Sequence, residues 1–269
     1  MTILDEIRAH KEVEVAMRQT AWPLLEVQRA CASAPAVRSM QDVLARPGIQ
    51  IVAEVKRRSP AKGNLSLGAD APSLATRYAE AGAAGVSVLT DERFFSGSDA
   101  DLTAVRAAID IPILRKDFTI SSYQIHEARS IGADVILLIV AMLSDTQLRS
   151  FLDSAASLHM EAIVEAHTEE EVRRAVALGA QMIGINNRNL ATFEVDLGTT
   201  ERLRPLITGP ALVIGESGIS TRADVVRLER AGADAVLIGE ALVTAQDARA
   251  KIHELLGLDR EPVGSSNAR

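Results

Sequence analysis

The chain has 269 residues, of which 47% are hydrophobic and 24% are charged, as is usual for a globular protein with a substantial core. Aromatic residues make up only 3%, so aliphatic side chains must fill that core, which favours helices packed on short strands over a β-sandwich. The net charge of −7 argues against a general nucleic-acid binder, although a local basic pocket can still hold a small anion.

Cysteine usage and apolar runs narrow the class of protein further. Cys31 is the only cysteine, which excludes a disulfide within the chain and a cysteine-based metal site. The first residues are too charged for the core of a signal peptide, and the apolar run 135–143 is too short to span a bilayer. We therefore expect a cytoplasmic enzyme or binding protein.

The first ~20 residues are predicted to be helical, because apolar residues recur there at helical spacing. Residues 1–48 precede the repeat described next, and we interpret them as an N-terminal helical extension. Our hypothesis is that this charged helix covers the active-site end of the molecule and contributes to substrate binding. The polar residues 259–269 are predicted to be a disordered tail.

Between these two segments, a Gly-Ala pair recurs about every 50 residues, beginning at Gly82, Gly132, Gly179 and Gly232. Each glycine follows an Ala-rich helical stretch, at the position where a left-handed cap favours glycine. Each pair precedes an apolar run that is typical of a strand buried on both faces.

Further strands are predicted between these repeats. A βα unit needs about 25 residues, so each interval holds two units. The additional apolar segments are 112–116, 161–165 and 211–215, and the segment 49–56 stands in front of them. Eight strands alternating with helices predict an α/β fold, a (βα)8 TIM barrel over residues 49–258, with an open doubly wound sheet as the alternative.

Polar side chains stand at the carboxyl ends of five predicted strands, which is where this fold builds its active sites. Residues two apart on a strand share a face, so Glu54 and Lys56 are expected to point the same way. One such ion pair would more often be structural, but five strand ends together favour an acid–base site, because neighbouring buried charges shift one another's pKa values. The residues are Glu54, Lys56, Lys116, Glu165, Asn186, Glu216 and Ser217.

The loops after the seventh and eighth strands predict a phosphate site. They contain Gly218 and Gly239, and glycine lets backbone N–H groups approach an anion closely. Two histidines and the cysteine are decoys in our interpretation. We expect His167 to lie in the loop that caps the next helix, and His126 and Cys31 to be structural.

Several segments resemble the indole-3-glycerol-phosphate synthase family, in order, from about residue 49 to 245. They include IVAEVKRRSP at 51–60, PILRKDF at 112–118 and IGINNRNL at 183–190. The resemblance implies conversion of 1-(2-carboxyphenylamino)-1-deoxyribulose 5-phosphate into indole-3-glycerol phosphate, a step of tryptophan biosynthesis that releases carbon dioxide and water. It also implies that the reaction needs no cofactor and no metal.

The same resemblance implies roles for the polar residues. Lys116 would be the general acid for ring closure, and Lys56 would assist in binding and dehydration. Glu54 and Glu165 would serve as base and as charge partners of the lysines; how they and Lys56 divide the proton transfers stays open. Asn186 and Arg188 would hold the substrate carboxylate. The other implied contacts are an apolar slot of Phe95, Leu137 and Leu190, a phosphate cradle of Ser59, Gly218 and Gly239, and ribulose-hydroxyl contacts from Glu216 and Ser217.

Other functions of a phosphate-binding barrel fit these residues less well. Phosphoribosylanthranilate isomerase is another barrel that acts on a phosphosugar, but it uses a Cys–Asp acid–base pair. In this chain no cysteine stands at a predicted strand end. A barrel that only binds phosphorylated ligands would lack at least one of the four charged residues Glu54, Lys56, Lys116 and Glu165. A synthase paralogue of a specialised pathway stays open. We expect a phosphorylated small-molecule substrate, no nucleic-acid or membrane partner, and a monomer or weak homodimer.

Overall fold

The computed structural model describes residues 2–56, 58–59, 63–64, 70–190 and 192–258. Within them, eight parallel strands close into a barrel, in the order β1-β10-β9-β8-β7-β6-β5-β4. This confirms the predicted (βα)8 barrel, and the open doubly wound sheet is wrong. The strands are β1 Gln50–Val55, β4 Gly85–Leu89, β5 Ile113–Lys116, β6 Val135–Ile139, β7 Glu161–Ala166, β8 Met182–Asn186, β9 Leu212–Glu216 and β10 Ala235–Ile238.

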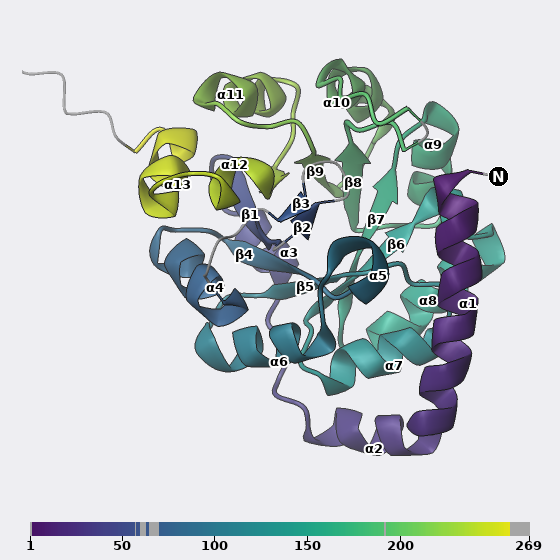
Figure 1. Ribbon diagram of the computed structural model, residues 1–269. Helices are drawn as coiled ribbons and strands as arrows, with labels where there is room; N and C mark the ends of the chain where they lie inside the picture. Colours follow the sequence, from purple (N-terminus) through teal and green to yellow (C-terminus); the bar gives the residue numbers. More distant parts are fainter. Residues whose placement is uncertain (1, 57, 60–62, 65–69, 191, 259–269) are drawn as a thin grey trace, which may run out of the picture.

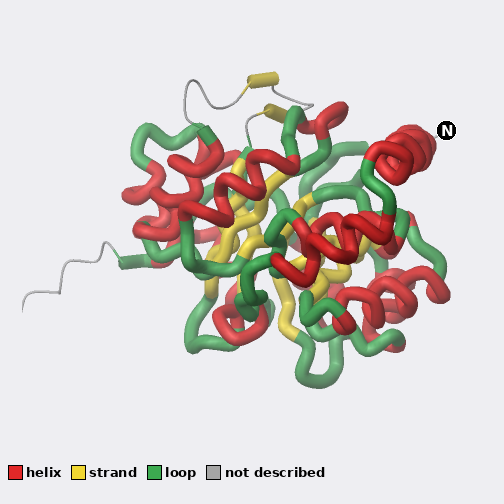
Figure 2. Tube along the Cα trace, turned by 90° about the horizontal axis from the view of Figure 1, so that it is seen from below, coloured by secondary structure: helices red, strands yellow, loops and turns green. Residues whose placement is uncertain are grey.

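Helices surround the strands on the outside, as the view in Figure 2 shows. A two-stranded antiparallel sheet of β2 (Arg58–Ser59) and β3 (Gly63–Asn64) follows β1, and the sequence pattern does not predict it. The barrel helices are α4 Ala71–Glu80, α5 Glu92–Phe95, α6 Asp99–Ala108, α7 Ser122–Ser130, α8 Asp145–Ser157, α9 Glu169–Ala177, α10 Gly198–Leu203, α11 Arg222–Arg230, α12 Glu240–Val243 and α13 Ala248–Leu256, with the 3-10 turns η1 Val140–Met142 and η2 Arg204–Leu206.

The glycine repeat has the backbone geometry that its position predicts. Gly82, Gly132, Gly179 and Gly232 have φ of +94°, +96°, +77° and +92°. A residue with a Cβ rarely adopts this left-handed region, so each glycine ends its helix and turns the chain toward the next strand. The described helices include none that is both long and apolar enough to cross a membrane.

Three helices precede the barrel: α1 Ile3–Ala21, α2 Leu24–Ser33 and α3 Met40–Leu44. The predicted N-terminal helix is confirmed, and it begins with a capping box between Thr2 and Asp5. Figure 1 shows α1 along the outside of the barrel and α2 beside α7. At the opposite end of the barrel from the mouth, the carboxylate of Glu161 accepts hydrogen bonds from the first turn of α3, including the N–H of Met40 at 2.8 Å.

The extension is joined to the mouth of the barrel by a buried cation, Lys11 of α1. Its Nζ lies 2.9 Å from Asp91 Oδ2 and 2.8 Å from Asp117 Oδ1, and the side chains of all three residues are buried. Asp91 and Asp117 lie in the loops that follow β4 and β5. Helix α1 is therefore attached to the rim of the mouth, and its contribution to substrate binding stays a prediction.

Candidate active site

The candidate site lies at the carboxyl ends of the strands, where four charged side chains point into the barrel mouth. Glu54 comes from β1, Lys116 from β5, Glu165 from β7 and Glu216 from β9. These strands alternate around the barrel, and side chains from alternate strands form the interior layers of this fold. The strand register puts all four on the same face of the barrel wall, so the structure brings these four predicted residues together.

Lys116 lies at the centre of this group. Its Nζ donates to Glu165 Oε2 at 2.9 Å and to Glu216 Oε2 at 2.6 Å. Burial alone would lower the pKa of Lys116, but the carboxylates of Glu165, Glu216 and Glu54 outweigh it and raise that pKa above its ordinary value. The ammonium form is therefore the resting state, and it carries a proton into the mouth.

Glu165 is held by donors on both of its oxygens. While Oε2 faces Lys116, Oε1 accepts from Asn186 Nδ2 at 3.1 Å. Asn186 Oδ1 in turn accepts from the backbone N–H of Arg188 at 3.0 Å, which fixes the amide. Burial would raise the pKa of Glu165, but Lys116 and His167 lower it below its ordinary range. Glu165 is therefore a carboxylate in the resting site.

Glu216 fills a space that a glycine leaves open in the neighbouring strand. A Cβ on Gly184 of β8 would collide with the Glu216 carboxylate, so this strand position needs glycine for lack of room. Burial raises the pKa of Glu216 to about 7, with the charge of Glu165 adding to the effect and Lys116 opposing it. Glu216 can therefore exchange a proton near neutral pH, which suits acid–base work.

We expect Glu216→Gln to stabilise the fold more at pH 8 than at pH 5. The folded-state pKa of Glu216 is raised, so its stabilising contribution is fully present below the unfolded value of about 4.5 and is lost as the pH rises through about 7. The amide copies the protonated form at every pH. The free energy of unfolding, measured with urea, should rise relative to the parent protein by about 1–3 kcal/mol between pH 5 and pH 8. The exposed Glu80→Gln is the control, and a flat difference for Glu216→Gln would contradict the prediction.

The second predicted lysine, Lys56, stands on the β1 side of the mouth. Its Nζ is 3.6 Å from Glu54 Oε1 and 5.5 Å from the centroid of the Phe95 ring, a cation–π distance. The Phe95 ring lies 6.0 Å from that of Phe118. A Cβ on Gly239 would collide with the Glu54 carboxylate, so the chain after β10 passes directly against this group. Lys56, Glu54, Phe95 and Gly239 are thus brought together.

The remaining predicted residues lie around this centre. The loop after β9 has left-handed backbone at Ser217, with φ +66°, and at Gly218, with φ +79°. Leu137 is buried in β6, in register with Ile163 and therefore one level below Glu165. Arg188 and Leu190 are half-buried in the loop after β8, where the Arg188 guanidinium donates to a backbone carbonyl of the same loop. The side chain of Ser59 lies outside the described residues.

Sequence reasoning missed the role of His167. It lies in the loop before α9, as expected, but its ring also reaches the site, with Nε2 3.3 Å from Glu165 Oε1. The signal was available, because His167 follows Glu165 by two residues, the same spacing that selected Glu54 and Lys56. The two other decoys agree with a structural role: Cys31 Sγ donates to the carbonyl of His126, and the His126 ring contacts the carbonyl of Ser122.

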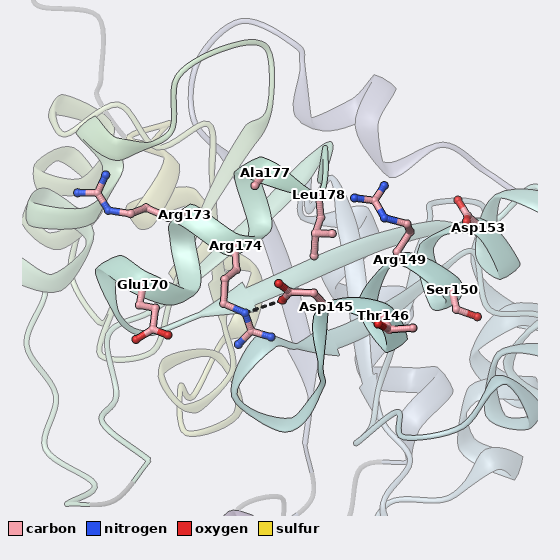
Figure 3. A pocket seen from close by; sticks show the side chains of 10 residues that line it. All are labelled: Asp145, Thr146, Arg149, Ser150, Asp153, Glu170, Arg173, Arg174, Ala177 and Leu178. Atoms are coloured by element: carbon pink, nitrogen blue, oxygen red, sulfur yellow. Dashed lines mark hydrogen bonds and ion pairs between the residues drawn. The ribbon is translucent and has the colours of Figure 1, made fainter.

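A surface groove of about 910 Å³ between α8 and α9 is separate from this site (Figure 3). Arginine and acidic side chains both line it, and Arg174 Nε donates to Asp145 Oδ1 at 2.7 Å. None of its lining residues belongs to the predicted site, and the balanced charges do not select an anionic ligand. The mouth of the barrel is therefore the better candidate.

Comparison with known proteins identifies relatives over the whole barrel. The model of the family described as "Indole-3-glycerol phosphate synthase" matches residues 4–255. Proteins of that name from Rhodococcus opacus and Mycobacterium avium are 48% and 47% identical, covering 97% and 100% of this chain and 97% and 98% of theirs.

Solved structures of other barrels share the fold at much lower identity. A 3-hexulose-6-phosphate synthase superposes with a TM-score of 0.62 at 17% identity, covering 78% of this chain and 99% of its own. A thiamine phosphate pyrophosphorylase from Pyrococcus furiosus gives 0.59 at 16% identity, covering 81% and 96%. These two likenesses bear on the fold alone.

Proposed function

The chain belongs to the indole-3-glycerol phosphate synthase family, and we propose that it closes the indole ring at the barrel mouth with Lys116 as the general acid. The enzyme is a carboxy-lyase of tryptophan biosynthesis that acts on a phosphorylated small molecule. The observation that carries the proposal is the Lys116 ammonium, held between the carboxylates of Glu165 and Glu216 where the strands end.

Ring closure needs a cation beside the substrate ketone. The aromatic ring attacks the ketone carbon, negative charge develops on its oxygen, and a nearby ammonium can stabilise that charge and donate a proton. Lys116 is protonated at rest and buried, so its charge acts in a medium of low dielectric constant. A substrate that displaces one of the two carboxylates from Lys116 would take its place as a partner of the Lys116 ammonium.

The later steps need a base and a second acid. After the carboxylate has left the attacking ring carbon, the hydroxyl departs as water and a base takes a proton from the new five-membered ring. We assign these transfers to Glu54, Glu165 and Lys56 and leave their division open. Asn186 lies between Glu165 and the loop of Arg188. We propose that Asn186 and Arg188 hold the substrate carboxylate until it leaves as carbon dioxide.

Binding of the two ends of the substrate is assigned to the rim. We place the aromatic ring against Phe95, Leu137 and Leu190, and the ribulose hydroxyls near Glu216 and Ser217. The phosphate is assigned to Ser59, Gly218 and Gly239. The supporting observation is that Gly218, with φ +79°, and Gly239 lie directly after the carboxyl ends of β9 and β10, where glycine lets backbone N–H groups approach an anion closely.

We also propose the setting in which the enzyme works. It acts in the cytoplasm as a monomer or weak homodimer, without nucleic acid or membrane, and residues 1–48 serve as a helical extension of the barrel of residues 49–258. The predicted tail, 259–269, lies outside the described residues.

The assay that tests the proposal is direct. Purified protein mixed with 1-(2-carboxyphenylamino)-1-deoxyribulose 5-phosphate should produce indole fluorescence that grows with time, without added metal or nucleotide. Saturable binding of this compound with no fluorescence would overturn the catalytic role and leave a barrel that only binds it.

A further inference from the structure

His167 is a half-buried titratable side chain that the proposed mechanism does not use. Its side chain is 11% exposed, and the ring lies between two carboxylates. Nε2 is 3.3 Å from Glu165 Oε1, and Nδ1 is 3.2 Å from Glu171 Oε2 in the first turn of α9. Glu171 also accepts the backbone N–H of His167 at 2.7 Å, so the imidazole is fixed at its outer side.

Both ring nitrogens lie beside a carboxylate: Nδ1 is hydrogen-bonded to Glu171, and Nε2 is within ion-pair distance of Glu165. A neutral imidazole has one N–H and one lone pair, so it would present no proton to one of the two carboxylates. The imidazolium has an N–H on both nitrogens and a positive charge that attracts both carboxylates. Burial would lower the pKa of His167, but its hydrogen bonds and charge interactions with Glu165 and Glu171 raise that pKa to about 10.

The imidazolium completes a row of alternating charges that leads to the proposed acid. From α9 inward, the row runs Glu171, His167, Glu165, Lys116 and Glu216. Of the other charged groups of α9, Glu169, Glu170 and Arg173 are exposed, and Arg174 donates to Asp145 of α8 and to the carbonyls of Val140 and Leu143. From β8, Asn186 adds a neutral donor to Glu165.

We infer that His167 is a positioning residue whose imidazolium keeps Glu165 ionised and turned toward Lys116. The inference rests on the proposed function of that lysine. Glu165 Oε1 faces Asn186 and His167, while Oε2 faces Lys116, so the two oxygens are divided between the structural and the reacting side. Without His167, Glu165 would be a buried carboxylate with one cation instead of two, and it would take up a proton at higher pH.

The first test is the pH profile of His167→Gln. The acid limb of kcat/KM should move up by about one pH unit, so activity on that limb falls about tenfold while the loss at pH 8 is smaller. KM at pH 8 should stay near that of the parent protein. His126→Gln, which replaces a half-buried histidine on α7 away from the site, is the matched control. An unmoved acid limb, with only a lower melting temperature, would overturn the inference, because a purely structural role predicts that result.

A second test does not depend on activity. The His167 ring signals in a proton NMR titration, assigned by their loss in His167→Gln, should show protonation persisting above about pH 8. Glu165→Gln should lower that titration by at least about one pH unit. Titration of His167 below about pH 7 in the parent protein would overturn the inference. If the parent protein formed no indole, the proposed function would fail, and this titration would still decide the charge of His167.

Discussion

Lys116→Met is expected to lower the rate of indole formation by about a thousandfold or more while the barrel stays folded. Methionine keeps the length and apolar stem of the lysine but removes the proton that ring closure needs, and a positioned general acid is worth about 10²–10⁴ in rate. The buried charge is removed as well, which adds the loss of electrostatic stabilisation. Single-turnover indole fluorescence measures the rate, and circular dichroism checks the fold.

Lys56→Met is the informative companion of this variant. Lys56 lies by Glu54 and Phe95, whereas Lys116 bridges Glu165 and Glu216, so the two lysines occupy different sides of one mouth. We expect Lys56→Met to retain ring closure at a reduced rate. Near-parental turnover in Lys116→Met, together with complete loss in Lys56→Met, would mean that Lys56 and not Lys116 is the general acid.

The barrel was predictable because its signal is local and repeated. Gly82, Gly132, Gly179 and Gly232 each occupy a left-handed cap, and one such residue per pair of βα units sets the count of strands. An apolar run after each cap has no polar face, so burial on both sides follows. The β2–β3 hairpin carried no such pattern, because two-residue strands have no period to read.

The site was predictable where it depends on strand alternation and not where it depends on contacts between distant segments. Glu54, Lys116, Glu165 and Glu216 were selected by their places at strand ends, and the register puts all four on one face of the barrel wall. The two-residue spacing also applies to His167 after Glu165, so the interpretation of His167 as only a loop residue was too narrow. The contact of Lys11 with Asp117 joins residues about a hundred positions apart, and no local spacing indicates it.

Lys11→Met is expected to cost about 3–5 kcal/mol of unfolding free energy, because it leaves Asp91 buried without its cation and Asp117 with Arg115 alone. Burial would lower the pKa of Lys11, but these two carboxylates raise it, so the folded protein holds the ammonium firmly. Urea unfolding at pH 7 gives the number. Lys251→Met, which breaks an ion pair within α13 at the surface, should change it by less than about 1 kcal/mol.

The pH dependence separates loss of this charge from loss of packing. Burial would raise the pKa of Asp117, but Lys11 and Arg115 hold it at about 2. A lowered folded-state pKa stabilises the fold above the unfolded value of about 3.8, and that contribution is lost as the pH falls toward 2. Without Lys11 the pKa of Asp117 rises, so Lys11→Met should unfold in acid at a higher pH than the parent protein. An equal acid midpoint would assign the destabilisation to packing of α1. Since Asp117 directly follows Lys116, a true charge effect should also lower turnover, whereas a packing defect confined to α1 should not.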